Sequence, residues 1–228
     1  LVVGVALPIF SSAQNDFGVW TGADVRLPIT KKLDAGLQLE SRFTNNASMV
    51  NKSFISPYVK YDLKKHIGLG LAYRFGNRPI TGLLGGDTYH RIGLDVNFTD
   101  LLELFMKKTK LKLDTRLRYT HAWDRGDLNN DNIRTRVKLS YNLPKTKLKP
   151  HFAAEFFLHL NDQLIYTSTS VTGNHRLNKY RLRLGLEYPI NKRHELNLYY
   201  IVEPEFESPD THFILGLGYN YEIKRKKR

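Results

Sequence analysis

Charged side chains occupy alternate positions in several stretches of this sequence. The basic ones are Lys112, Arg116, Arg118, Arg134, Arg136, Lys138, Arg181 and Arg183, and the acidic ones that share their spacing are Glu40, Asp95, Asp114, Glu155 and Glu187. Side chains of both signs on one face either pair across a narrow interior or, where some stay unpaired and wet, bias the space around them toward anions. The elements that carry these residues decide between the two.

Serine and histidine residues could supply hydrolytic chemistry if they met an orienting polar group. His121 and His212 lie near the ends of alternating segments, and Ser168 and Ser170 lie in a polar stretch between two such segments. No spacing in the sequence fixes their mutual distances, whereas a real site shows convergent groups. We therefore expect no catalytic residue and no enzyme, and a membrane-embedded lipid hydrolase is the least favoured function.

Metal and nucleotide sites are also not expected. His151 and His159 share one polar face with Glu155, but eight residues of strand span roughly 26 Å at about 3.3 Å per residue, too far for two ligands of one metal ion. The chain contains no cysteine, which excludes disulfides and cysteine-zinc sites. No glycine-rich phosphate loop opens a helix, and the basic face lacks an aromatic stacking platform. We expect no metal, no cofactor and no nucleic-acid partner.

The alternation of polar and apolar residues predicts β-strands. It is clearest between residues 111 and 143, where two alternating arms flank the stretch DRGDLNND and form one hairpin. Each arm exceeds the usual soluble strand of about 5–6 residues and reaches the roughly 9–11 residues with which a tilted strand crosses a bilayer. We predict strands near residues 17–29, 33–44, 52–63, 66–77, 87–99, 110–123, 132–143, 149–160, 178–190, 194–204 and 211–223.

The number of segments bears on how the strands close. Bacterial single-chain barrels have even strand numbers, which allow antiparallel closure. The eleven segments in the sequence therefore indicate that one strand is missed or split, or that one segment does not join the wall. We predict an all-β, antiparallel up-and-down transmembrane barrel of ten or twelve strands, with twelve favoured.

The connections between the segments are of two kinds. Short basic ones comprise residues 30–32, 64–66, 145–147 and 191–193, and longer ones rich in Asn, Gly, Asp, Ser and Pro comprise residues 45–51, 76–87, 124–131, 161–175 and 205–210. Short turns at one rim and long loops at the other are typical of outer-membrane barrels, so we expect periplasmic turns and extracellular loops. Residues 100–109 are expected to form a short interfacial helix.

The apolar face of these strands could point outward to lipid or inward to the core of a soluble lipocalin-like barrel or sandwich. A soluble barrel interior closes tightly only near eight strands, too few for the apolar side chains of this chain. Aromatic residues gather near strand ends on the apolar face, as interfacial girdles require. The opposite face carries charges of both signs in the middle of the strands, which suits a wet lumen. We therefore predict that the apolar face points outward.

The 228 residues suffice for one barrel domain. Residues 1–13 are apolar and end in small residues, which predicts the remnant of a secretory signal cleaved before Gln14. The barrel is then expected over residues 14–223 and a basic tail over residues 224–228. The net charge is +13, and basic residues gather in the short turns and in the tail. Basic turns either contact anionic headgroups, at about 1 kcal/mol per residue, or simply keep the turns soluble.

Six segments carry a resemblance to a known family. They are residues 16–27, 33–43, 90–98, 179–190, 194–206 and 212–223, the last of which places aliphatic residues at alternate positions and closes on tyrosines. Over essentially all of its mature part the chain resembles the outer-membrane β-barrels of unknown function found in Bacteroidota. The resemblance implies a barrel without implying an activity. One departure is that Tyr221 is followed by Glu222, Ile223 and five basic residues, whereas such barrels usually end on an aromatic residue that the assembly machinery reads.

Two functions of different classes follow. If basic residues of the lumen stay unpaired and wet, the protein is a small passive, porin-like channel that favours anions. If the opposite charges pair across the interior, it is a closed barrel with a structural or interaction role. We expect an outer-membrane location after export, with the surrounding lipids, the barrel assembly machinery and a small anionic solute as partners.

Overall fold

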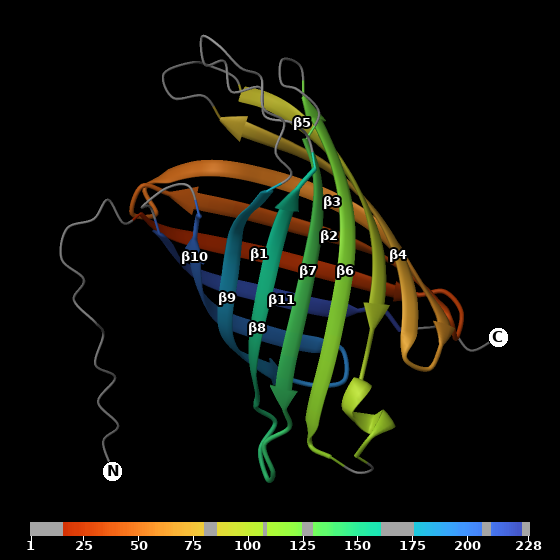
Figure 1. Ribbon diagram of the computed structural model, residues 1–228. Helices are drawn as coiled ribbons and strands as arrows, with labels where there is room; N and C mark the ends of the chain where they lie inside the picture. Colours follow the sequence, from red (N-terminus) through yellow and green to blue (C-terminus); the bar gives the residue numbers. More distant parts are fainter. Residues whose placement is uncertain are drawn as a thin grey trace, which may run out of the picture.

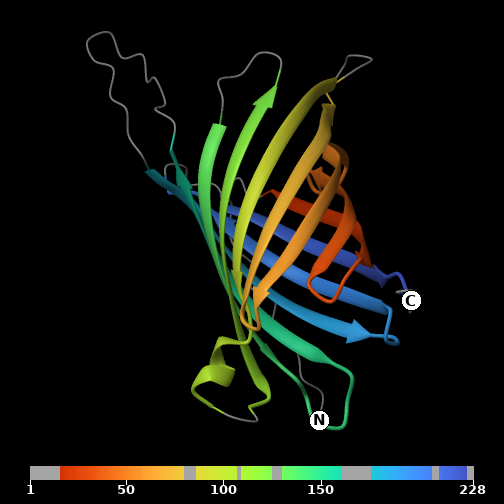
Figure 2. The ribbon, with the colours of Figure 1, turned by 90° about the vertical axis from the view of Figure 1, so that its right-hand side faces the viewer.

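The computed structural model describes residues 16–79, 86–106, 109–124, 130–160, 176–206 and 211–224. Its strands form one closed β-barrel. The strands of the front wall cross those of the back wall at a large angle (Figure 1). Figure 2 shows the same wall from the side. The predicted signal remnant, the tail from residue 225 and most of four predicted long loops lie outside the described residues.

Eleven strands make up the described part of the wall, and each predicted strand segment is present. They are β1 (Phe17–Pro28), β2 (Leu33–Thr44), β3 (Met49–Lys64), β4 (Ile67–Pro79), β5 (Gly86–Phe98), β6 (Leu111–Asp124), β7 (Asn130–Tyr141), β8 (Lys149–His159), β9 (Arg176–Pro189), β10 (His194–Pro204) and β11 (Thr211–Glu222). The bounds agree with the predicted segments to within a few residues, so the alternation identified the strands correctly.

The barrel closes through a parallel pair of strands. Consecutive strands pair antiparallel all the way round. The first and last of eleven strands therefore run in the same direction, and β1 pairs with β11 in parallel, from Phe17 opposite Phe213 to Arg26 opposite Glu222. A parallel ladder also satisfies the facing backbone groups, through evenly spaced slanted hydrogen bonds. The predicted all-β barrel is confirmed, whereas the even strand number and the fully antiparallel wall are wrong, because eleven strands close through one parallel pair.

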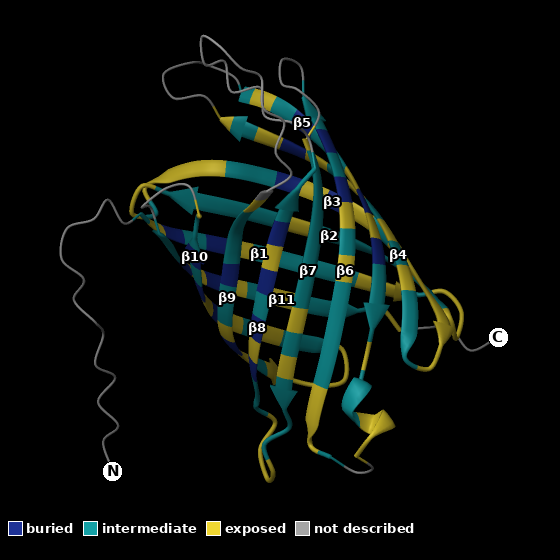
Figure 3. Cartoon of the chain, viewed as in Figure 1, coloured by how far each residue is buried: buried dark blue, intermediate teal, exposed yellow. Residues whose placement is uncertain are grey.

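Apolar side chains point outward from the barrel, as predicted. Along β4, Leu69, Leu71, Tyr73 and Phe75 are 42%, 47%, 38% and 43% exposed, whereas the residues between them face the interior. Figure 3 shows the resulting alternation of exposed and less exposed residues along the strands. Because a strand directs successive side chains to opposite faces, this pattern gives the barrel an apolar outer wall and a polar inner wall.

A small apolar cluster lies inside the barrel near the rim where β1 begins. It consists of Trp20, Tyr199, Ile201 and Ile214. Ile201 has no exposed surface. The cluster packs the neighbouring strands β1, β10 and β11 together across the parallel seam. Full burial of an aliphatic side chain such as that of Ile201 contributes about 1.5–3 kcal/mol to stability.

Glycines on the inner wall lie directly opposite aromatic residues of the next strand. Gly76 of β4 faces Tyr89 of β5, and Gly216 of β11 faces Tyr199 of β10. A Cβ atom at Gly216 would lie only 1.9 Å from the Tyr199 ring. The absent side chain therefore lets the ring lie flat against the wall instead of projecting into the interior.

We expect Gly216→Ala to lower the free energy of unfolding by about 1–3 kcal/mol, because Tyr199 must leave its position on the wall. Gly218→Ala is the matched control on the same strand, since its Cβ would meet its nearest neighbour, Asn197, at 3.6 Å, an ordinary contact. Urea unfolding in detergent micelles measures both. Equal stability of the two variants would contradict this account of Gly216.

The four short basic turns join β1 to β2, β3 to β4, β7 to β8 and β9 to β10, and thus lie at one rim. The connection from β5 to β6 reaches the same rim and contains η1 (Leu101–Leu104), a 3₁₀ helix, at the position of the predicted interfacial helix. Lys65 donates a hydrogen bond of 2.7 Å to Glu103 of η1. Among the described residues, no helix is long and apolar enough to cross a membrane.

Candidate functional site

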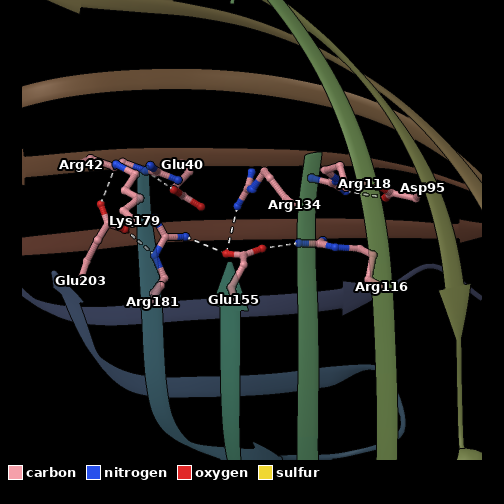
Figure 4. Close-up of polar contacts among 10 residues, drawn as sticks. All are labelled: Glu40, Arg42, Asp95, Arg116, Arg118, Arg134, Glu155, Lys179, Arg181 and Glu203. Carbon is pink, nitrogen blue, oxygen red and sulfur yellow. Dashed lines mark hydrogen bonds and ion pairs between the residues drawn. The ribbon is translucent and has the colours of Figure 1, made fainter. Parts of the chain in front are cut away.

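Glu155 of β8 is the centre of an ion-pair network inside the barrel. Its carboxylate contacts Arg116 of β6 at 2.9 Å, Arg134 of β7 at 3.0 Å and Arg181 of β9 at 3.0 Å. Figure 4 shows the three guanidinium groups converging on it. Glu155 is only 5% exposed, so water screens these pairs much less than it screens pairs on a protein surface.

Arg181 extends this network toward the rim of the long loops. Its Nε donates a hydrogen bond of 2.6 Å to Glu203 of β10. Lys179 contacts Glu203 at 3.0 Å and Glu205 at 3.4 Å. One chain of alternating charges therefore connects β6, β7, β8, β9 and β10 across the interior (Figure 4).

Two further ion pairs lie at the sides of the network. Arg118 holds Asp95 of β5 through two hydrogen bonds, and Arg42 contacts Glu40 of the same strand at 2.5 Å. The Arg42 guanidinium also lies over the Trp20 ring, 3.6 Å from its centroid. The ring packs against one face of the guanidinium, which is a favourable cation–π contact.

Three cavities follow one another along the inside of the barrel. The loop-rim cavity has a volume of about 360 Å³ and is lined by Asp16, Lys52 and His212 among others. The central cavity, about 310 Å³, shares Arg42, Arg134 and Arg181 with it. The turn-rim cavity, about 700 Å³, shares Arg136 and Arg183 with the central one. These shared arginines therefore lie where adjoining cavities meet.

Basic side chains outnumber acidic ones in the central cavity. Among the described residues, its basic lining consists of Arg42, Lys60, Arg74, Arg116, Arg118, Arg134, Arg136, Arg181 and Arg183, and its acidic lining of Asp24, Glu40, Asp95 and Glu155. The register places like charges directly opposite each other, as with Arg74 and Arg91 and with Arg116 and Arg136. Such pairs repel. The described lining of the central cavity therefore carries more positive than negative side chains.

The structure brings most of the sequence-predicted site residues together and leaves others apart. Nine of them line the central cavity: Arg116, Arg118, Arg134, Arg136, Arg181, Arg183, Glu40, Asp95 and Glu155. Lys138 and Glu187 pair with each other at 2.5 Å and line the turn-rim cavity. Lys112 contacts Asp100 at 3.0 Å, and Asp114 accepts a hydrogen bond from the Asp100 backbone. Lys112 and Asp114 therefore lie at the start of β6 against the connection that contains η1, and they are not part of the lining of the central cavity.

The prediction missed basic residues on β2, β3 and β4. Arg42, Lys60 and Arg74 line the central cavity, and Lys52 lines the loop-rim cavity. Each lies on the polar face of a predicted strand, so extending the alternation to residues 33–77 would have found them. Their strands do not carry basic residues at successive inward positions, as β6 and β7 do, so no clear pattern of charge marks these four residues in the sequence.

His121 and His212, the two histidines considered for hydrolysis, do not form a common site. His121 is on the outer face, where its Nδ1 lies 2.8 Å from Asp131, whereas His212 lines the loop-rim cavity inside. The barrel wall separates the two, and Ser168 and Ser170 lie outside the described residues. His151 lies 3.7 Å from Glu187, and His159 is hydrogen-bonded to Asn132 at 2.7 Å.

The fold and the site define a class of protein: a closed β-barrel with an apolar outer wall and an interior rich in arginine. The chain belongs to the family described as "Protein of unknown function (DUF2490)", whose model matches residues 17–213. This range extends from the first residue of β1 into β11, so the family corresponds to the barrel itself. No curated protein matches the chain.

Proposed function

We propose that the chain forms a narrow passive pore in a bacterial outer membrane and that its lumen favours small anions. The observation that carries the proposal is the central cavity, where eight arginines and Lys60 face four carboxylates among the described residues. Charges fixed in a narrow, partly desolvated space act at a lower effective dielectric constant than in bulk water. They therefore raise the local concentration of anions and repel cations.

Strand length and the outer wall support the membrane part of the proposal. The strands are between 11 and 16 residues long, at or above the roughly 9–11 residues that a tilted strand needs to cross a bilayer. Outward aromatic residues such as Tyr61, Tyr188 and Tyr219, which are 43%, 41% and 37% exposed, lie toward the rim of the short turns, where an aromatic girdle would be. Outer-membrane lipids would surround this wall after the barrel assembly machinery inserts it.

The proposed orientation predicts which tags are accessible on intact cells. Epitope tags within residues 129–131 or 168–173 should be labelled, because long loops of outer-membrane barrels are extracellular. Tags within residues 145–147 should be labelled only after the outer membrane is permeabilised. The reverse pattern would invert the orientation, and a soluble periplasmic protein would contradict the location.

Conductance of the purified protein in planar bilayers tests the function directly. We expect discrete current steps and, in a potassium chloride gradient, a reversal potential with the sign of anion preference. The preference should weaken as salt rises, because the screening length falls from about 30 Å at 0.01 M to about 10 Å at 0.1 M. Current steps with cation preference would contradict the proposed lumen.

One observation favours a second function, the closed barrel with a structural or interaction role. Glu155 binds three arginines across the interior, and Arg181 is only 7% exposed. If these pairs persist, they obstruct the passage between the loop-rim and central cavities. The same bilayer experiment distinguishes the two functions. A correctly inserted barrel that never conducts would contradict the pore and support the closed barrel.

A further inference from the structure

Three of the eight arginines that line the central cavity differ from the other five in their partners. Arg74 of β4, Arg136 of β7 and Arg183 of β9 line this cavity from different parts of the wall. Within the described part of the chain, none of the three makes an ion pair, although the other five arginines of the cavity each do. The guanidinium groups of these three side chains are therefore not occupied by a carboxylate at contact distance.

The carboxylates of the cavity already have other partners. Glu40 is held by Arg42 at 2.5 Å and Asp95 by Arg118. Asp24 accepts a hydrogen bond of 2.8 Å from Tyr58. Glu155 is surrounded by its own three arginines, described above. Within the described residues, each of these carboxylates is therefore engaged by a group other than Arg74, Arg136 and Arg183.

Aromatic rings hold two of these arginines in place. The Arg74 guanidinium carbon lies 3.5 Å from the centroid of the Phe54 ring, and that of Arg183 lies 4.1 Å from the centroid of the Tyr199 ring. Stacking uses the face of a guanidinium, whereas its N–H donors point outward in the plane of the group. The donors thus stay available in a fixed geometry, which lowers the entropic cost of ordering the side chains when an anion binds.

We propose that Arg74, Arg136 and Arg183 form a binding site for a phosphate or sulfate dianion, either the free ion or the charged group of a small solute. Guanidinium groups bind such oxyanions through paired, charge-assisted hydrogen bonds. The central cavity of about 310 Å³ has the volume of about ten water molecules, room for the oxyanion and a small organic group. The site adds to the proposed pore function by naming the class of solute. Only the claim that this solute passes through the barrel rests on that function.

Titration of the purified full-length barrel in detergent micelles with inorganic phosphate tests the site. Calorimetry at constant ionic strength, with chloride as the replaced ion, should give saturable binding of phosphate and none of chloride. Arg74→Gln and Arg183→Gln should each weaken phosphate binding at least tenfold. Arg26→Gln is the matched control: Arg26 is also on the inner wall, but it is paired with Asp34 at 2.5 Å and lines the turn-rim cavity. The affinity of the Arg26→Gln variant for phosphate should stay within twofold of the wild-type affinity.

Two results would overturn the site: phosphate that binds no better than chloride, or Arg74→Gln and Arg183→Gln variants that keep wild-type affinity. Should Arg74→Gln fail to fold, as judged by circular dichroism, Arg136→Gln takes its place with the same expected loss.

Glycerol phosphate separates the two sources of the ligand. Tighter binding than that of inorganic phosphate indicates a phosphorylated solute, and weaker binding indicates the free ion. A barrel that binds phosphate but never conducts refutes the pore and keeps the site, whereas one that conducts without binding phosphate refutes the site alone.

Discussion

Glu155→Gln is expected to lower the free energy of unfolding by about 3–5 kcal/mol. The substitution keeps the shape of the side chain but removes the negative charge that contacts Arg116, Arg134 and Arg181. Removing one partner of a buried ion pair leaves an uncompensated charge in a poorly solvated interior, and this costs far more than the loss of a surface pair. Urea unfolding in micelles, followed by the fluorescence of Trp20 in a Trp123→Phe background, measures the change.

Glu205→Gln provides the control for this experiment. The Glu205 side chain is 37% exposed and pairs with Lys179 at 3.4 Å, so its loss should cost less than about 1 kcal/mol. Arg134→Gln added to Glu155→Gln should recover part of the lost stability, because it removes one of the like charges left behind. A loss below 1 kcal/mol for Glu155→Gln, without rescue, would show that Glu155 does not compensate the arginines.

The double substitution Arg136→Glu and Arg183→Glu should shift the reversal potential of the pore from anion toward cation preference. Both residues line the central cavity and the turn-rim cavity, and reversing both nearly removes the excess of basic over acidic side chains in the central cavity. The shift should be largest at low salt, where the screening length exceeds the radius of the lumen. Planar-bilayer recordings across a salt gradient give the reversal potential.

Lys31→Glu with Lys32→Glu is the matched control, because it makes the same change of charge in an exposed turn at the same rim, and neither residue lines one of the three cavities. Its effect should be smaller and should disappear in concentrated salt. If the wild type conducts and the double substitution at positions 136 and 183 leaves the reversal potential unchanged, these arginines do not line the conducting path.

The strands and their outward face could be predicted from the sequence because both depend only on local periodicity. In residues 111–143, for example, the alternation puts Arg116, Arg118, Arg134 and Arg136 on the polar face, and all four line the central cavity. A strand keeps this period whatever its neighbours are. The local pattern was therefore sufficient to place Arg116, Arg118, Arg134 and Arg136 on the inner wall.

The ion pairs could not be predicted, because they depend on how the whole wall closes. Arg116 and Glu155 are 39 positions apart in the sequence, and they meet only because β7 brings β6 and β8 to suitable registers. Arg74 was overlooked because its inward neighbours on β4 include Ala72 and Gly76, so that no run of charge marks it. Parallel closure was excluded in advance by the even strand numbers of bacterial barrels.

The parallel pairing of β1 with β11 also separates the two ends of the barrel. β1 begins at Phe17 beside the rim of the long loops, whereas β11 ends at Glu222 beside the turn around Arg193, where its backbone N–H donates to the Arg193 carbonyl. A barrel with an even number of strands would instead bring both ends to one rim. In a membrane, labels at Asp16 and Lys224 would therefore report from opposite compartments. For the same reason, a circular permutant could not join the two ends with a short linker and would need an additional strand to return across the bilayer.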